Sequence, residues 1–342
     1  MGIARDELPE DRQARRWLTD PELALSIQND HFLSIAAEPD SYRRLLETLV
    51  ACPRLHFTSL SELQAGHPAD KAAVAIRHDI DFDICTAATL ARLEHDLGVR
   101  GCYYVLHTQP YYAHRENGRR FRSRRCVEIL LEIQELGHEI GLHNDALHDL
   151  VHHGVPVKET LAAELDHLRS HGVRVKGTAS HGSYHTYLAA NYEVFVGLSI
   201  SGRTHFIDAK GARHELGQVD MKELGLSYEA NYILRSYMIS KAEYDRIHDY
   251  KFICQTHEND AFERDYDAQF GIFGRDLWLG TNERVQAVRC LTRCEALDGL
   301  LSRKPGERIV LDSHPEYYGR TRRRLWRRWW HRTAARLLGG AS

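Results

Sequence analysis

The stretch AAVAIRHDID, residues 72–81, decides the fold and raises the question of function. Its first five residues form a short apolar run, which is typical of a strand that is buried on both faces. The run then ends in Arg-His-Asp-Ile-Asp, which places four ionisable side chains within five residues. Such an end is either a solvated strand terminus or the edge of a functional site.

Strand and helix patterns alternate downstream of this stretch. Apolar residues in three- and four-residue steps, each series closed by a glycine, predict helices over 83–98, 123–137 and 158–172. Apolar runs predict strands over 100–107, 138–143, 175–181, 251–257 and 308–314, and a further helix is expected near 283–303. This alternation predicts a mostly parallel sheet, either open and doubly wound or closed into a barrel.

Length and composition limit the remaining possibilities. The 342 residues, 43% of them apolar, can bury a large core. The net charge of −3 gives no indication of a nucleic-acid partner. The seven cysteines are odd in number and form no CxxC pair, so they are expected to be reduced. There is no signal peptide and no apolar stretch of about 20 residues, so a cytoplasmic location is expected.

Each predicted strand ends in or next to a histidine. The apolar runs finish in RHDID, YYVLHT, EIGLHND, GTASHGS, ICQTHEN and IVLDSHP. In a parallel barrel the carboxyl ends of all strands lie on one face, where active sites of such folds are built. The sequence therefore predicts that side chains from distant parts of the chain converge there, namely His78, Asp79, Asp81, His107, His143, His181, His257 and His314.

Histidine and carboxylate without thiolate suit a divalent transition metal, most naturally zinc. Such a metal would lower the pKa of a bound water and polarise a carbonyl. A carboxylate outside the ligand set could then act as general base, and a histidine outside it as general acid. The motifs GxGxxG, GxxxxGK[ST], GxSxG and HExxH are not found, so dinucleotide, P-loop, serine-hydrolase and zincin sites lack support.

The segments AIRHDIDFD, LGVRGCYYVLH, ELGHEIGLHND, SHG and LDSHPEYY resemble the polysaccharide deacetylase, or NodB-homology, superfamily of carbohydrate esterases. They are similar to a divergent branch whose first motif reads RHDxD. The resemblance covers about 72–181 and 305–318. It implies an α/β fold, a distorted (β/α) barrel of about seven parallel strands. It also implies metal-dependent removal of N-acetyl groups from a sugar or glycan in polysaccharide or glycoconjugate biosynthesis.

The resemblance assigns roles to four residues. It makes Asp79 the catalytic base and Asp81 a metal ligand. His143 matches the first histidine of the second family motif and is a further ligand. His314 ends the last strand and is expected to protonate the departing amine. Pro315 and the two tyrosines after it could help to build the sugar-facing rim.

The third ligand is where this sequence departs from the family pattern. The second motif places another histidine four residues after His143, but Leu147 stands there. Either His148 completes the site through a shifted loop, or His181 does so from the next strand, or metal binding is weakened or lost. His148 and His152 have the spacing of a ligand pair on a helix, although an ordinary amphipathic segment is the favoured interpretation of that stretch.

Five further residues are expected to bind substrate or to support the site: His78, Asp145, His107, His257 and Asp312. The period of two along a strand predicts that His78 points away from the side of Asp79. The same period places Asp312 on the side of His314, where it could orient the imidazole.

Domain organisation follows from these patterns. Residues 1–70 are expected to form an extension packed on the barrel, 71–318 the barrel with an irregular insertion around 183–250, and 319–342 a basic amphipathic helix. Within that helix, residues 320–338 suit either the surface of an anionic membrane or packing of a tryptophan stripe on the barrel. The location would then be peripheral at the inner membrane face or simply cytoplasmic.

Two alternative functions remain open. One is a related metal-dependent hydrolase that acts on another amide C–N bond. The other is a catalytically silent deacetylase-like module that binds glycan, an alternative that depends on the missing histidine at Leu147.

Overall fold

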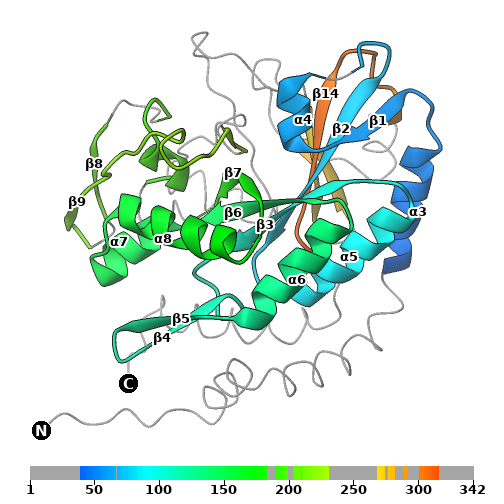
Figure 1. Ribbon diagram of the computed structural model, residues 1–342. Helices are drawn as coiled ribbons and strands as arrows, with labels where there is room; N and C mark the ends of the chain where they lie inside the picture. Colours follow the sequence, from blue (N-terminus) through cyan, green and yellow to red (C-terminus); the bar gives the residue numbers. More distant parts are fainter. Residues whose placement is uncertain are drawn as a thin grey trace, which may run out of the picture.

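The computed structural model describes residues 39–66, 68–182, 189–198, 203–208, 210–230, 268–273, 276–281, 289–290 and 300–315, with the segments between 268 and 290 as backbone only. It has an α/β fold in which helices pack against a curled, half-barrel sheet (Figure 1). The predicted α/β class and barrel-like curvature are confirmed. Seven strands and the NodB type of barrel stay predictions.

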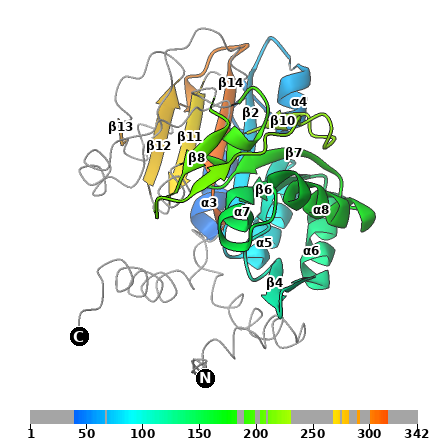
Figure 2. The ribbon, with the colours of Figure 1, turned by 90° about the vertical axis from the view of Figure 1, so that its left-hand side faces the viewer.

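The central sheet has ten strands in the order β10-β7-β6-β3-β2-β14-β11-β12-β13, with β1 pairing alongside β2. Every pairing from β10 to β11 is parallel, and so is that of β1 with β2, whereas β11–β12 and β12–β13 are antiparallel. Figure 2 shows these antiparallel strands beside β14. Within the described ranges no ladder joins β13 to β10. The strands are β1 (Leu55–Thr58), β2 (Ala72–Ile80), β3 (Gly101–Leu106), β6 (Glu139–Asn144), β7 (Val175–Ser180), β10 (Tyr228–Glu229), β11 (Ala268–Phe273), β12 (Asp276–Thr281), β13 (Arg289–Cys290) and β14 (Arg308–Ser313).

The helices follow the predicted alternation closely. The three helices predicted between the central strands are α5, α6 and α8. Asp83 begins α5, because its carboxylate accepts hydrogen bonds from the amides of Cys85 and Thr86 at 3.1 and 3.0 Å. The described helices are α3 (Pro39–Val50), α4 (Leu60–Ala65), α5 (Ile84–Asp96), α6 (Arg124–Glu135), α7 (Ala146–His153), α8 (Val157–Ser170) and the 3-10 turn η1 (Asn191–Val194). Two antiparallel hairpins complete the described elements, β4 (Ala113–Glu116) with β5 (Arg119–Arg122) and β8 (His205–Ile207) with β9 (Arg213–Glu215).

The two faces of the sheet bury different kinds of side chain. On the outer face, Tyr103 and Val105 of β3 pack with the apolar sides of α5, α6 and α8. On the inner face, Gly141 and Gly177 leave room for two tyrosine rings. A Cβ atom on Gly141 would lie 2.3 Å from the Tyr104 ring, and one on Gly177 would lie 2.0 Å from the ring of Tyr228. These rings fill the inside of the half-barrel below the carboxyl ends of the strands.

The carboxyl-terminal part of the sheet differs from its prediction. The prediction of a helix near 283–303 is wrong at Arg289–Cys290. These two residues form β13 and pair with Trp278 and Leu279 of β12. The ladder to β12 supplies hydrogen-bond partners that a spacing pattern in one segment cannot reveal. Only residues 300–301 of this range are helical where the structure describes it.

Several expectations concern residues that are not described. The strand at 251–257, residues 1–38 of the extension and the basic helix at 319–342, including 320–338, lie outside the described ranges. The described parts of the insertion hold η1, the β8–β9 hairpin and β10. Among the helices that the structure describes, none is both long enough and apolar enough to cross a membrane.

Candidate metal centre

Three predicted residues meet at the carboxyl ends of β2, β6 and β7. Asp81 follows β2, His143 lies in β6 and His181 follows β7. The Nε2 atom of His143 lies 3.3 Å from Oδ1 of Asp81, and Nε2 of His181 lies 3.9 Å from the same oxygen. One ligand atom from each residue lies within 4.8 Å of the other two, a spacing in which all three could hold a metal ion.

The alternation of side chains along parallel strands explains this convergence. Inner-face positions recur every second residue, and they include the small residues and tyrosines that fill the half-barrel. Above that filling, each strand continues its inner-face series into polar residues near its carboxyl end. These residues are Arg77, Asp79 and Asp81 at β2, His143 at β6, His181 at β7, and Asp312 and His314 at β14.

The imidazole of His143 is held in the tautomer that a metal ligand requires. Its Nδ1 atom lies 2.8 Å from the carbonyl oxygen of Ala179, which can only accept a hydrogen bond, so Nδ1 carries the proton. In the neutral ring the lone pair is therefore on Nε2, the atom that faces Asp81. The Oδ1 atom of Asp81 is itself buried and has no hydrogen-bond partner in the described part of the chain. Burial raises the pKa of Asp81, but the imidazoles of His314, His181 and His143 outweigh it and lower that pKa.

His181 is oriented by a second carboxylate. Its Nδ1 atom lies 3.5 Å from Oδ2 of Asp145, which directs Nε2 toward Asp81. Carboxylate–histidine pairs of this kind fix the orientation of metal-ligating imidazoles. Burial lowers the pKa of His181, but Asp145 and the other nearby carboxylates raise it to about 9 overall. Burial raises the pKa of Asp145, and His181 reverses this and lowers it to about 2.

The His181–Asp145 pair predicts a pH dependence of stability in metal-free protein. A raised histidine pKa contributes stability that is full below its unfolded value of 6.5 and is lost as the pH rises through about 9. The lowered pKa of Asp145 contributes stability above 3.8 that is lost as the pH falls through about 2. The free energy of unfolding of wild type minus that of Asp145→Asn should therefore be largest between pH 3.8 and pH 6.5, and it should shrink as the pH rises toward 9. Urea denaturation with chelator present checks this, and a difference that stays constant from pH 6.5 to 9 would contradict it.

Asn191, which the sequence did not single out, supports both members of this pair. Its side-chain amide donates to Oδ1 of Asp145 at 3.0 Å and to the carbonyl of His181 at 3.1 Å. Its own oxygen accepts from the amide of Leu147 at 3.0 Å. Thr108 donates to the other oxygen of Asp145 at 3.1 Å. Asn191 lies in the irregular region after β7, where no periodic pattern could have identified it.

Asp79 lies beside the three ligand candidates but is engaged by an arginine. The Nε and terminal nitrogen atoms of Arg77 donate to its two oxygens at 2.8 and 2.5 Å, and Nε2 of His143 lies 3.7 Å away. Burial raises the pKa of Asp79, but Arg77 and His143 outweigh it and lower that pKa, so the carboxylate stays ionised. Arg77 also lies 3.8 Å from Asp312, whose pKa is raised by burial that Arg77 only partly offsets.

Removal of Arg77 should be strongly destabilising. The arginine is almost completely buried between Asp79 and Asp312, so Arg77→Leu leaves two buried carboxylates without their shared cation. Loss of one member of a buried ion pair costs about 3–5 kcal/mol. The control is Arg92→Leu, because Arg92 pairs with Glu132 on the surface and should cost no more than about 1 kcal/mol. Chemical denaturation measures the free energy of unfolding of both variants. Equal losses of stability in Arg77→Leu and Arg92→Leu would contradict the expectation.

His314 faces a different oxygen of Asp81 from the one that the two candidate ligand histidines face. Its Nε2 atom is 3.5 Å from Oδ2 of Asp81, whereas His143 and His181 face Oδ1. The orientation of His314 by Asp312 stays a prediction.

The structure places His78 and His107 away from the ligand cluster. His78 points to the outer face, as strand alternation predicted, where Nε2 lies 2.6 Å from Glu94 and the ring stacks on Tyr103. It therefore supports the packing of β2 on α5 and does not lie beside the site. Nε2 of His107 accepts a hydrogen bond from the amide of Asp145 at 3.0 Å, and burial lowers its pKa to about 4. A neutral His107 thus stabilises the turn after β6.

His148 does not complete the Asp81 cluster. It lies on α7 with Nδ1 3.6 Å from Asp149, in a separate group with His153. Of the candidates for the third ligand, His181 from the next strand is the one that the structure places beside Asp81 and His143. His257 lies outside the described residues.

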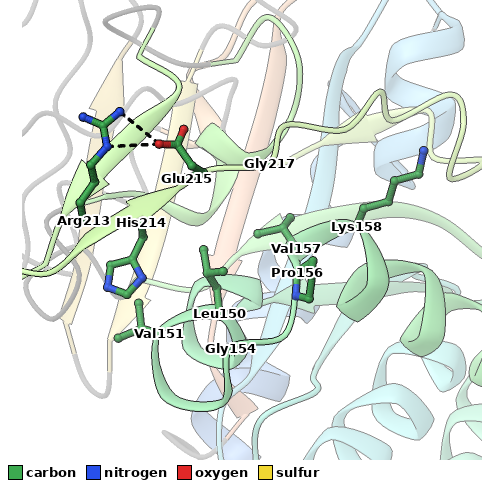
Figure 3. Close-up of a pocket in the computed structure, with 10 residues that line it drawn as sticks. All are labelled: Leu150, Val151, Gly154, Pro156, Val157, Lys158, Arg213, His214, Glu215 and Gly217. Atoms are coloured by element: carbon green, nitrogen blue, oxygen red, sulfur yellow. Dashed lines mark hydrogen bonds and ion pairs between the residues drawn. The ribbon is translucent and has the colours of Figure 1, made fainter.

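An open hollow lies between the α7–α8 turn and β9, separate from the candidate metal centre (Figure 3). Leu150, Val151, Pro156 and Val157 form its apolar wall. Each ionisable group that lines it has a partner: Arg213 pairs with Glu215, His214 with Asp208 and Lys158 with Glu223. It offers no free charge that would select a ligand.

Comparison with known proteins adds no assignment. No family model matches the chain, and neither a search of curated proteins nor one of solved structures found a match.

Proposed function

We propose that this protein is a metal-dependent hydrolase that removes N-acetyl groups from a sugar or glycan. The observation that carries the proposal is the clustering of Asp81, His143 and His181 next to a separate carboxylate, Asp79, and a separate imidazole, His314. A hydrolase of this type needs a ligand set, a base and an acid within one site. The motif resemblance to polysaccharide deacetylases supports the choice of an acetamide as substrate.

The three ligand candidates suit a zinc-like ion. Two imidazole nitrogens and one carboxylate oxygen leave a coordination position open, as catalytic zinc sites do. The proton on Nδ1 of His143 and the unsatisfied Oδ1 of Asp81 fit a cation between them. Asp145 behind His181 supplies the outer carboxylate that commonly accompanies a metal-bound histidine. When bound, the ion supplies Lewis acidity toward a water molecule and a carbonyl oxygen.

Asp79 has the position of a general base. It lies beside the ligand cluster without belonging to it, and Arg77 holds it ionised and fixed in orientation. In the proposed reaction its carboxylate accepts a proton from the attacking water. The water oxygen forms a bond to the acetamide carbonyl carbon.

His314 has the position of a general acid. The C–N bond of the tetrahedral species breaks with its electron pair on nitrogen, and His314 donates the proton that this nitrogen needs. The products are acetate and a free amine, so water supplies the oxygen added to the acyl group. His314 lies beside Oδ2 of Asp81, and Asp79 lies beside Nε2 of His143.

An acetate-release assay over a panel of N-acetylated sugars and nucleotide sugars tests the proposal. Metal-loaded protein should release acetate and free amine in equal amounts from at least one compound. A chelator should abolish the release, and added zinc should restore it. Release of an amine without acetate would favour hydrolysis of another amide bond, and metal binding without any hydrolysis would favour a glycan-binding module.

A further inference from the structure

Helix α7 carries a second group of potential metal ligands. His148, Asp149 and His153 each offer one ligand atom, and these atoms lie within 4.8 Å of one another. Oδ1 of Asp149 is the common neighbour, 3.6 Å from Nδ1 of His148 and 3.9 Å from Nε2 of His153. This group shares no residue with Asp81, His143 and His181, so an ion here does not depend on the proposed function.

The helical spacing explains how this group forms. Asp149 and His153 are four residues apart and therefore lie on the same side of the helix. His152, four residues after His148, brings a third ring within 4.8 Å of the His148 ring centroid. The imidazoles of His148 and His153 thus lie beside one carboxylate oxygen, and the His152 ring lies beside that of His148.

One nitrogen atom in this group lies near Asp149 but too far from it for a hydrogen bond. Nδ1 of His148 is buried and has no hydrogen-bond partner in the described part of the chain. A buried polar atom without a partner carries a free-energy cost, which coordination of an ion would remove. The side chains of His148 and His153 are each 34% exposed, so an ion can reach the group from solvent.

The surroundings of Asp149 indicate which ion the group would bind. Arg115 lies 3.2 Å from Oδ1 and Arg120 lies 2.7 Å from Oδ2, so the carboxylate is already neutralised. A carboxylate oxygen has a second lone pair, which leaves Oδ1 able to bind a cation as well. Ions that rely on carboxylate charge, such as Mg²⁺ and Ca²⁺, are disfavoured there, whereas ions that prefer imidazole nitrogen are not.

We propose that His148, Asp149 and His153 form a second site for a divalent transition-metal ion of the zinc class, distinct from the candidate metal centre. Its affinity is lower than that of a site with an unpaired carboxylate, because the two guanidinium groups repel the cation.

Equilibrium dialysis of the full chain against Zn²⁺, with elemental analysis, tests this site. The background is Asp81→Asn with His143→Ala, which removes the candidate metal centre. Adding His148→Ala and His153→Ala should lower the bound zinc by one ion per chain. The matched control is His167→Ala with His171→Ala, a pair at the carboxyl end of α8 with ring centroids 4.6 Å apart that belongs to neither ligand group, and it should leave the zinc count unchanged.

A measurement on the wild-type chain covers the case in which these variants misfold. Zn²⁺, but not Mg²⁺, should protect His148 and His153 from an imidazole-modifying reagent, as read by peptide mass spectrometry. Unchanged zinc binding after loss of both histidines, equal loss in the control pair, or absence of protection in wild type would each overturn the second site. None of these outcomes bears on acetate release.

Discussion

Asp79→Asn is expected to lower acetate release by about 10²–10⁴-fold, the usual contribution of a general base. Asparagine has nearly the same shape but cannot accept the proton of the attacking water. The zinc content should stay that of wild type, because Asp79 lies beside the ligand cluster and is not a member of it. Steady-state rates and elemental analysis of the purified variant measure the two effects separately.

The control for this variant is Asp83→Asn. Asp83 also follows β2, but it caps α5, and asparagine is as good a cap as aspartate. Its activity and zinc content should match those of wild type. If Asp79→Asn keeps its activity, Asp79 is not the base, and if it loses its metal, Asp79 is a ligand.

His181→Ala is expected to weaken metal binding at the candidate metal centre, the tighter of the two proposed sites, by more than about 100-fold. The reason is that loss of outer-shell partners alone costs about 10–100-fold in metal affinity. His148→Ala should leave the tighter site unchanged, because His148 belongs to the α7 group. Isothermal titration with Zn²⁺ gives both affinities. The opposite ranking would mean that His148 is the third ligand and that the α7 helix lies differently in the metal-bound protein.

Helical geometry explains why the identity of the third candidate ligand could not be predicted from the sequence. One residue along an α-helix is a rotation of about 100°, so a histidine that is one position late points elsewhere. Leu147 is completely buried in the core, whereas His148 turns toward Asp149. His181 reaches the cluster because it extends the inner-face series of β7. A motif that is compared position by position along one segment cannot show that a histidine from another strand takes the place of the one missing at Leu147.

Much of the site followed from strand ends. Parallel strands place their carboxyl ends together, so Asp81, His143, His181 and His314 could be predicted to meet from apolar runs alone. Arg77 was missed although it has the same alternation as Asp79, because a charged residue within a buried strand was not taken as part of the site. The signal was present two residues before Asp79.

Other features carried no readable signal. Glu94 is completely buried on α5, where it accepts hydrogen bonds from Tyr42 and Tyr103 and pairs with His78. Its partners come from three separate elements, and no local pattern relates them. Asn191 likewise joins segments that are distant in the sequence. Strand β11 pairs with β12 and also with β14, which is distant from it in the sequence.

The proposed chemistry makes a definite statement about where the new oxygen atom in the products comes from. Metal-loaded protein is incubated with an N-acetylated sugar in water enriched in heavy oxygen, and both products are analysed by mass spectrometry. One heavy oxygen atom should enter each acetate, the amine should carry none, and a chelator should abolish both products. Acetate formation that persists in fully metal-free protein, or the absence of acetate from every N-acetylated substrate with metal bound, would contradict the proposal.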